Sequence, residues 1–281
     1  MNFEAIGLTD KQKKRLEKNI NYWDKDRVAE SQNRLSNKTA KQIDTQMRKY
    51  YKNAAKQVMT EFELVYQKIL TQIEKGQEPT PALLYKLDTY WQLQAQLRDT
   101  LNSLGERQVA LLTKNFERNY FEIYHSISLE GTVAFNTLDT AAVQQMVNSI
   151  WVADGKHFSQ RIWDNNKLLI QTLNDELIHC VATGAKTSRL KQLLQERFNV
   201  SYSNANMIAR TELAHIQTEA AKKRYEDYGI QEIEVWAEKD ERQCDICGKL
   251  HKQRFPIGTQ PPIPAHPNCR CCIVPVVNIE E

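Results

Sequence analysis

Residues 43–73, IDTQMRKYYKNAAKQVMTEFELVYQKILTQI, decide the fold. Their apolar side chains recur at steps of three or four residues, which places them along one face of an α-helix. Charged and amide residues occupy the other faces. The stretch therefore predicts a long amphipathic helix that buries a single stripe, formed by Ile43, Met47, Tyr51, Ala54, Val58, Phe62, Val65, Ile69 and Ile73.

The flanking sequence extends this helix and pairs it with a second one. Residues 9–74 contain neither proline nor glycine, and Gly76 supplies a stop. Thr80 and Pro81 suit an N-cap and a first helical position. A second apolar stripe follows and resumes after Gly105, so a short link joins two long amphipathic segments. We expect an antiparallel hairpin, the helical arm, over residues 1–130; its second stripe consists of Leu83, Leu87, Tyr90, Leu97, Leu101, Leu104, Val109, Leu112, Phe116, Tyr120, Ile123 and Ile127.

Shorter helices are expected in residues 131–229, which form a helical body. Capping and stop signals predict helices over residues 139–151, 166–183, 188–198 and 203–228, with glycines at positions 184 and 229 ending two of them. Prolines then concentrate in the last quarter of the chain. Residues 230–237 alternate apolar and polar side chains, which predicts one half-buried strand in a small module over residues 230–281. The expected fold class is mainly α, with this small β/zinc-knuckle module at the C-terminus.

Composition and motifs exclude several classes of protein. A chain of 281 residues with 41% hydrophobic content can bury at least one core. It has no apolar run of about 18 residues, and its first residues lack the apolar core of a secretory signal, so we expect a cytoplasmic protein. The sequence shows no Gly-rich phosphate loop, no Gly-x-Ser-x-Gly elbow and no His-Glu-x-x-His pair, and we expect no enzyme.

Five cysteines and two histidines gather near the C-terminus. Cys244 and Cys247 have the spacing by which a tight turn brings two thiolates to one metal ion. His266 with Cys269 would complete a mixed site, whereas Cys269 with Cys271 would complete a four-thiolate site with His266 outside it. Either set is a closed tetrahedron, which is typical of structural zinc. In a segment with few apolar residues, bound zinc would supply folding free energy.

Other interpretations of these side chains compete with zinc. Two disulfides or simple buried thiols would need no metal, although the absence of a signal peptide argues against disulfides. His251 lies near enough in sequence to compete as a ligand, and we expect it to be a spectator. Cys180 stands alone in an amphipathic helix and is expected to be a buried small residue.

Two basic clusters are candidates for nucleic-acid binding. The net charge of +3 is too small to predict such binding by itself, and the alternative is a solvated helix face. Non-specific DNA binding through these clusters would weaken steeply with salt. The residues are Lys11, Lys13, Lys14, Arg15 and Lys18 in the first cluster and Lys222, Lys223 and Arg224 in the second.

The last half of the chain resembles a known family. In order, it carries Arg210-Thr-Glu on a helix, a strand ending in Trp236, Asp240 before the Cys-x-x-Cys turn, and His266-Pro-Asn-Cys-Arg-Cys. This combination resembles the phage head morphogenesis family, the Mu F-like minor head proteins of tailed bacteriophages. The resemblance covers residues 131–281, and the additional Cys272 departs from the family pattern.

The resemblance implies a structural role in head assembly. The implied location is the virion, at the portal vertex and head interior, after assembly in the host cytoplasm. The implied partners are the portal protein and capsid or scaffold proteins, with contact to packaged DNA or ejection alongside it. We also consider self-association of the helical arm as a coiled coil. The alternative function is a zinc-braced nucleic-acid-binding protein, or a nuclease or toxin in which the cluster forms a metal site and His251, His266 or Asp240 activates water.

The resemblance also implies a polar motif that braces the C-terminal module. Arg210 and Glu212 are two residues apart and cannot face each other on one helix, so each needs another partner. We consider Arg270 as the partner of Glu212, and Asp240 as the partner of Arg210.

Overall fold

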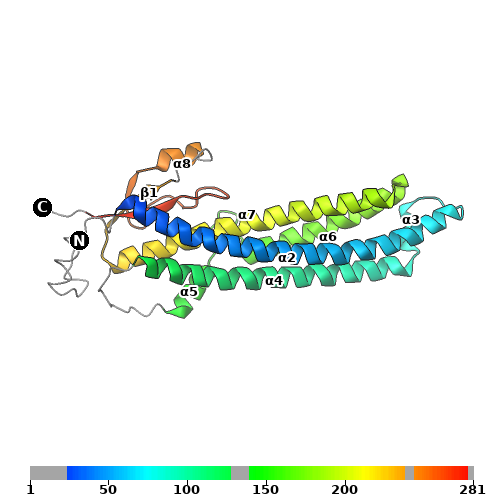
Figure 1. Cartoon of the computed structure of the whole chain (residues 1–281), viewed down its shortest axis with the longest axis horizontal. Helices are drawn as coiled ribbons and strands as arrows, with labels where there is room; N and C mark the ends of the chain where they lie inside the picture. The colour runs from blue at the N-terminus through cyan, green and yellow to red at the C-terminus, as the bar shows by residue number, and fades with distance from the viewer. Residues whose placement is uncertain (1–23, 128–138, 238–243, 278–281) are drawn as a thin grey trace. The chain divides into compact units, whose positions relative to one another are not determined.

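The computed structural model describes residues 24–127, 139–237 and 244–277, and the fold is mainly α, as predicted (Figure 1). Three antiparallel strands form one small sheet near the C-terminus. The helices are α2 (Lys25–Glu74), α3 (Pro81–Tyr85), α4 (Asp88–Ser126), α5 (Thr140–Val147), α6 (Phe158–Thr183), α7 (Thr187–Asp227) and α8 (Asp245–Leu250). The strands are β1 (Glu232–Trp236), β2 (Arg254–Pro256) and β3 (Cys272–Val276).

The chain divides into two compact units, each built from separated segments. The first unit contains residues 1–42, 113–151 and 207–281, and the second contains residues 43–112 and 152–206. Helices α2, α4 and α7 contribute residues to both units. The division into an arm (1–130), a body (131–229) and a C-terminal module (230–281) stays a prediction.

The second unit buries the apolar stripe of α2 that begins at Ile43. Of its nine positions, all but Ile73 are buried, and Met47, Val58, Phe62 and Ile69 have no exposed surface. The facing side chains come from α3 and α4 and from helices α6 and α7, which the stripe itself does not identify. They include Leu84, Leu93, Leu97, Leu101, Leu169, Leu173, Leu177, Leu190, Leu194 and Phe198.

A buried polar network crosses this core. The Tyr51 hydroxyl donates to the Ser201 carbonyl oxygen at 3.2 Å and accepts from the amides of Gln108 at 3.1 Å and Asn165 at 3.2 Å. Asn166 in turn donates to the Gln108 side-chain oxygen at 3.1 Å. These hydrogen bonds hold Ser201 inside α7, and the helix continues through this polar stretch. Two separate helices, 188–198 and 203–228, were expected there. The predicted break was wrong.

Helix α6 begins earlier than predicted, at Phe158 rather than near position 166. The His157 ring accepts a hydrogen bond from the Ser159 N–H, and the Gln160 side-chain oxygen accepts one from the His157 N–H. This capping box uses histidine where serine or threonine is usual, so the start was missed. The end was predicted correctly, since Gly184 takes the left-handed position with φ of 61°.

The first unit packs α7 and a short part of α2 against the sheet. Strand β1 lies between β2 and β3, pairing Ile233 with Phe255 and with Pro275. The expected strand at 230–237 is therefore confirmed as β1. A small core joins the sheet to α2 and contains Val28, Ala29, Trp236, Cys272 and Val274.

Polar contacts connect the same elements. The Gln32 amide on α2 donates to the Tyr225 hydroxyl at 2.9 Å, and that hydroxyl donates to the Ile273 carbonyl oxygen at 3.1 Å. In this unit α2 and α4 run antiparallel, as the predicted hairpin requires, and Ser36 donates to Asn119 at 3.4 Å (Figure 1). The α2–α7–β3 contacts hold the sheet in place beside the segment that carries the cysteines.

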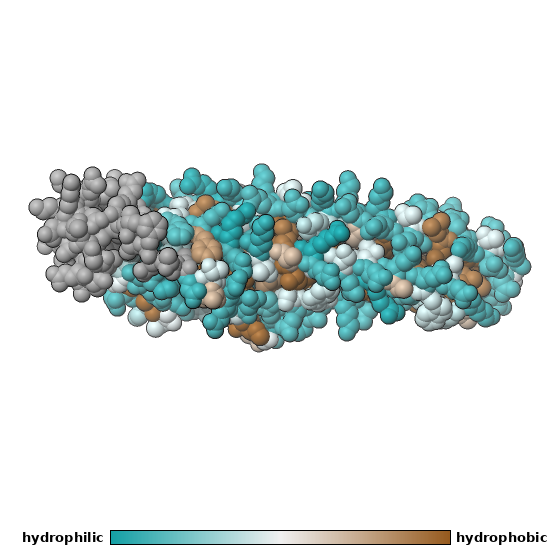
Figure 2. Space-filling view, turned by 90° about the horizontal axis from the view of Figure 1, so that it is seen from below, coloured by the Kyte–Doolittle hydropathy of each residue, from teal (hydrophilic) through white to brown (hydrophobic). Residues whose placement is uncertain are grey.

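The surface is mainly hydrophilic on the face that Figure 2 shows, with small, separate apolar patches. Large exposed apolar side chains are scattered over the helices, among them Leu64, Trp91 and Leu168. Among the described helices, none combines the length and the apolar character needed to cross a membrane.

Candidate metal centre

The first half of the site is a helix N-terminus. Cys244 is the N-cap of α8, and its sulfur accepts a hydrogen bond from the Cys247 N–H at 3.4 Å. The turn places Cys247 one helical turn along, so that both sulfurs face the same side. Cys247 is buried and Cys244 is half-buried. The Cys-x-x-Cys spacing thus produces the local geometry that the sequence predicted.

The second half is a turn that precedes β3. The Cys269 N–H donates to the His266 carbonyl oxygen at 3.1 Å, and Asn268 between them has a positive φ of 59°. Asparagine is one of the few residues that tolerate this left-handed conformation. The turn brings His266 and Cys269 to one side, toward the thiols of α8.

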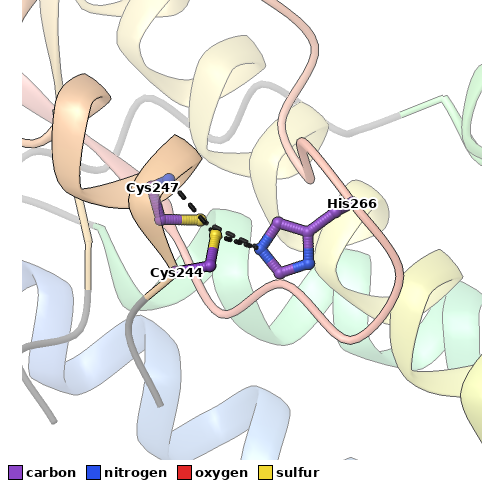
Figure 3. A group of neighbouring side chains, drawn as sticks. All are labelled: Cys244, Cys247 and His266. Carbon is purple, nitrogen blue, oxygen red and sulfur yellow. Dashed lines mark hydrogen bonds between the residues drawn. The ribbon is translucent and has the colours of Figure 1, made fainter. Parts of the chain in front are cut away.

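Five donor side chains meet at this place. The Nε2 atom of His266 lies 3.1 Å from the sulfur of Cys244 and 3.1 Å from that of Cys247 (Figure 3). The Cys247 and Cys269 sulfurs are 3.6 Å apart. Cys247, Cys269 and Cys271 form a second group whose sulfurs lie within 4.8 Å of one another. The structure therefore gathers all five predicted donors in a cluster that could hold a metal ion.

The orientation of His266 suits a ligand. Its Nδ1 atom lies 2.8 Å from the Pro267 carbonyl oxygen, which can only accept a hydrogen bond. In the neutral imidazole Nδ1 therefore carries the proton, and the lone pair is on Nε2, the atom that faces the two sulfurs. A carbonyl that fixes the tautomer in this way is typical of histidines that bind metals.

The thiols affect one another's protonation. A hydrogen bond from Cys271 lowers the pKa of the Cys269 thiol to about 5, and the Cys247 N–H lowers the pKa of Cys244. Burial raises the pKa of Cys247 to about 12. The hydrogen bond to Cys269, together with burial, raises the pKa of Cys271 above its ordinary value. The lowered pKa values shift Cys269 and Cys244 toward the thiolate form, the form that binds metal ions.

The remaining cysteines lie elsewhere. Cys272 is in the small core between the sheet and α2, and its thiol lies 3.8 Å from the Trp236 carbonyl oxygen. Cys180 is buried in α6, as expected. His251, the expected spectator, accepts a hydrogen bond at Nδ1 from the Ala237 N–H at 3.2 Å and packs its ring near Trp236.

The polar motif on α7 has partners that the sequence did not indicate. Glu212 is buried and accepts a hydrogen bond from the Trp151 indole at 2.8 Å. The indole also stacks on the ring of His215, with centroids 4.2 Å apart. The Thr211 hydroxyl accepts from the Asn268 N–H at 3.1 Å, which ties the cysteine turn to α7. The pairing of Arg270 with Glu212 stays a prediction, and Asp240 lies outside the described residues.

The second basic cluster, Lys222, Lys223 and Arg224, is partly buried. Arg224 is 5% exposed and lies between the rings of Tyr124 and Tyr228. Lys223 pairs with Asp227 at 2.6 Å, and Lys222 is 3.5 Å from Glu219. Because the Arg224 guanidinium cannot reach a phosphate backbone, we leave it out of any DNA-binding surface. The first cluster, Lys11, Lys13, Lys14, Arg15 and Lys18, lies outside the described residues.

The comparisons agree with the geometry. Residues 171–274 match the model of the phage Mu protein F-like family, a span that holds all five donors, α7 and β1. No curated protein and no solved structure matches the chain. The resemblance that the sequence motifs indicated is therefore confirmed over residues 171–274, the part of the chain that matches the phage Mu protein F-like family.

Proposed function

We propose that this chain is a structural minor head protein of a tailed bacteriophage and acts in head morphogenesis. The family match over residues 171–274 carries the proposal. The site in that span supports a structural rather than a catalytic role. Its donors are buried or half-buried thiols and one imidazole, and four such ligands would complete the closed coordination that is typical of structural zinc.

The metal is proposed to be zinc, bound by Cys244, Cys247, Cys269 and His266. Thiolate and imidazole ligands in a tetrahedral arrangement suit zinc. The lone pair of His266 Nε2 faces the Cys244 and Cys247 sulfurs, which favours the mixed set over four thiolates. Cys271 would then stand next to the ligand Cys269 as a neighbouring thiol. Bound zinc would supply a cross-link between α8 and the turn before β3.

The proposed partners are the portal protein and the capsid or scaffold proteins, and the proposed place is the virion, at the portal vertex. Assembly would take place in the host cytoplasm. Contact with packaged DNA and ejection with it belong to the same proposal, as does self-association through the helices. Lys222 and Lys223 remain candidates for DNA contact, although each already lies near a carboxylate.

Incorporation into heads tests the proposal. A phage that lacks the gene is complemented with tagged wild-type protein, with a Cys244→Ser/Cys247→Ser variant or with Cys272→Ser, and purified heads are blotted for the tag. We expect wild type and Cys272→Ser in heads, and reduced incorporation of the double variant. Cys272→Ser is the matched control because Cys272 is as buried as Cys247 but lies outside the cluster. Absence of the wild-type protein from purified heads would refute the proposed function.

A further inference from the structure

The metal centre holds one donor more than a single tetrahedral ion can use. Four ligands complete such an ion, whereas five donor side chains meet here. In the mixed set proposed above, the unused donor is Cys271. Its thiol is 3% exposed and is hydrogen-bonded to both Cys247 and Cys269. One zinc ion therefore does not account for this buried thiol in contact with two of its proposed ligands.

The backbone explains why Cys271 faces the cluster. Successive side chains of an extended segment point to opposite sides, so Cys269 and Cys271 share a side and Cys272 does not. The first two accordingly form a group of three thiols with Cys247. Cys272 packs instead in the small core with Val274 and α2. The position of each cysteine along the segment thus decides which thiols can reach a metal ion.

The five donors form two triangles that share Cys247. One consists of Cys244, Cys247 and His266, which point toward one another in Figure 3, and the other of Cys247, Cys269 and Cys271. In each triangle the donor atoms lie within 4.8 Å of one another. For metal–sulfur bonds of about 2.3 Å, the donors of a three-coordinate ion are about 4 Å apart. The distances of 3.1 Å from His266 Nε2 to its two sulfurs are shorter, so the first triangle widens when an ion enters.

The number of donors selects the kind of ion. Two three-coordinate ions that share one bridging thiolate use all five donors, whereas two tetrahedral zinc ions would need more donors than the cluster has. Cuprous copper accepts three ligands, and as a soft cation it prefers thiolate, with imidazole also suitable. Cys247, Cys269 and Cys271 are each at most 5% exposed, so the second triangle shields a cuprous ion from water.

We propose that this cluster is also a site for two cuprous ions, with the Cys247 thiolate bridging them. One ion binds Cys244, Cys247 and His266, and the other binds Cys247, Cys269 and Cys271. The thiols release their protons as the ions bind. This site goes beyond the proposed function, which assigns one zinc ion to four of the donors. Neither assignment depends on the other, because each concerns a different metal.

Native mass spectrometry of the reduced full chain, without oxygen, tests the number of ions. Zinc content is measured first, and cuprous ion is then added as its acetonitrile complex with a weak cuprous chelator that removes loosely bound copper. We expect wild type to bind two copper ions and to release its zinc, and Cys271→Ser to bind one. Cys272→Ser is the matched control and should bind two, because Cys272 is as buried as Cys271 but lies outside both triangles. Circular dichroism checks that the variants fold.

Copper K-edge X-ray absorption tests the bridging thiolate without any variant. Two copper ions joined by one sulfur lie close enough to scatter from each other, so the wild-type spectrum should contain a copper–copper path that the Cys271→Ser spectrum lacks. The proposal fails if wild type binds only one copper ion, if its copper–copper path is missing, or if Cys271→Ser and Cys272→Ser bind equal numbers of ions. The first two results need only wild type, so they decide the matter even if Cys271→Ser does not fold. Absence of zinc from the starting protein would count against the zinc assignment alone.

Discussion

Arg224 is the clearest case of a residue whose role follows from its surroundings and not from its sequence neighbours. Its guanidinium lies 4.6 Å from the centroid of Tyr124 and 4.2 Å from that of Tyr228, and it donates to the Tyr124 hydroxyl at 3.2 Å. In sequence it follows two lysines and looks like part of a solvated cluster. One of the two rings belongs to Tyr124 on α4, a hundred residues earlier in the chain. No local sequence pattern predicts a contact between residues so far apart.

Replacing Arg224 with alanine is expected to lower the free energy of unfolding by about 3 kcal/mol. The change removes desolvated cation–π contacts and leaves buried hydroxyl groups without their donor. Lys223→Ala is the neighbouring control, because the lysine side chain is 48% exposed and its ion pair contributes at most about 1 kcal/mol. Urea unfolding followed by circular dichroism measures both. Equal losses in the two variants would contradict the internal role of Arg224.

His215 makes stability depend on pH. Burial, and to a smaller extent Lys222, lowers its pKa from 6.5 to about 4. The unfolded chain therefore takes up the proton first as pH falls. The stability that the neutral ring contributes is complete above about pH 6.5 and is lost progressively down to about pH 4, by up to about 3 kcal/mol. Below that range the loss is complete.

His215→Phe keeps a ring against Trp151 but cannot titrate. Melting temperatures of wild type and variant are compared at pH 7 and at pH 4.5. Since the cluster ligands also bind protons in this range, the difference between the two proteins carries the information. We expect the variant to lose less stability than wild type on acidification. The same loss in both proteins would show that His215 does not contribute.

Among single residues, the clustering of the four cysteines with His266 was predictable from sequence, and the contacts of their neighbours were not. Cys-x-x-Cys and His-x-x-Cys spacings are local, so five donors could be named from sequence. The proposed choice among Cys269, Cys271 and His266 rests on the tautomer of His266, which depends on the Pro267 carbonyl. The contact of Trp151 with Glu212, 61 residues apart, has no periodic or spacing signal and was missed.

At the scale of elements, apolar periodicity predicted α2 and α4 well. Polar residues that usually mark helix ends led to a wrong start for α6 and a wrong break in α7. The polar side chains near Ser201 suggested a break, yet Tyr51 and Asn165 bond that serine within a buried network. Tertiary contacts thus override the local preference of serine and asparagine for helix ends. Gly105 shows the reverse. This glycine interrupts the apolar pattern of α4, yet the helix continues through it.

Gly105 lies inside α4 where another helix approaches. A Cβ atom there would lie 2.5 Å from the Trp163 ring and 2.8 Å from the Asn166 amide nitrogen. Alanine is favoured over glycine in a helix by about 1 kcal/mol, but this overlap costs about 1–3 kcal/mol. Asn166 is buried and bonded to Gln108, so it cannot easily move. We expect Gly105→Ala to destabilise the protein in urea unfolding.

A double-mutant cycle isolates the cause. Trp163→Ala removes the ring atoms that lie nearest to the added methyl group. In that background Gly105→Ala should cost clearly less than in wild type, since part of the steric overlap is gone. An identical cost in both backgrounds would mean that the close approach of Trp163 is not the reason for the glycine.

At the scale of the whole molecule, each compact unit combines segments from distant parts of the chain. Stripes on α2 and α4 tell which side chains are buried but not which helices cover them, and α6 and α7 share that role in the second unit. One small apolar core joins Trp236, Cys272 and Val274 of the C-terminal segment to residues 28 and 29 of α2. A metal cross-link between α8 and the turn before β3 would add folding free energy to this segment.

Zinc K-edge X-ray absorption of the reduced, purified chain tests this central claim most directly, because it counts the ligands and identifies their elements. We predict one zinc per chain with three sulfur ligands at about 2.3 Å and one nitrogen ligand at about 2.0 Å. Purified protein without zinc, or zinc with an oxygen ligand from water in an open position, would contradict it.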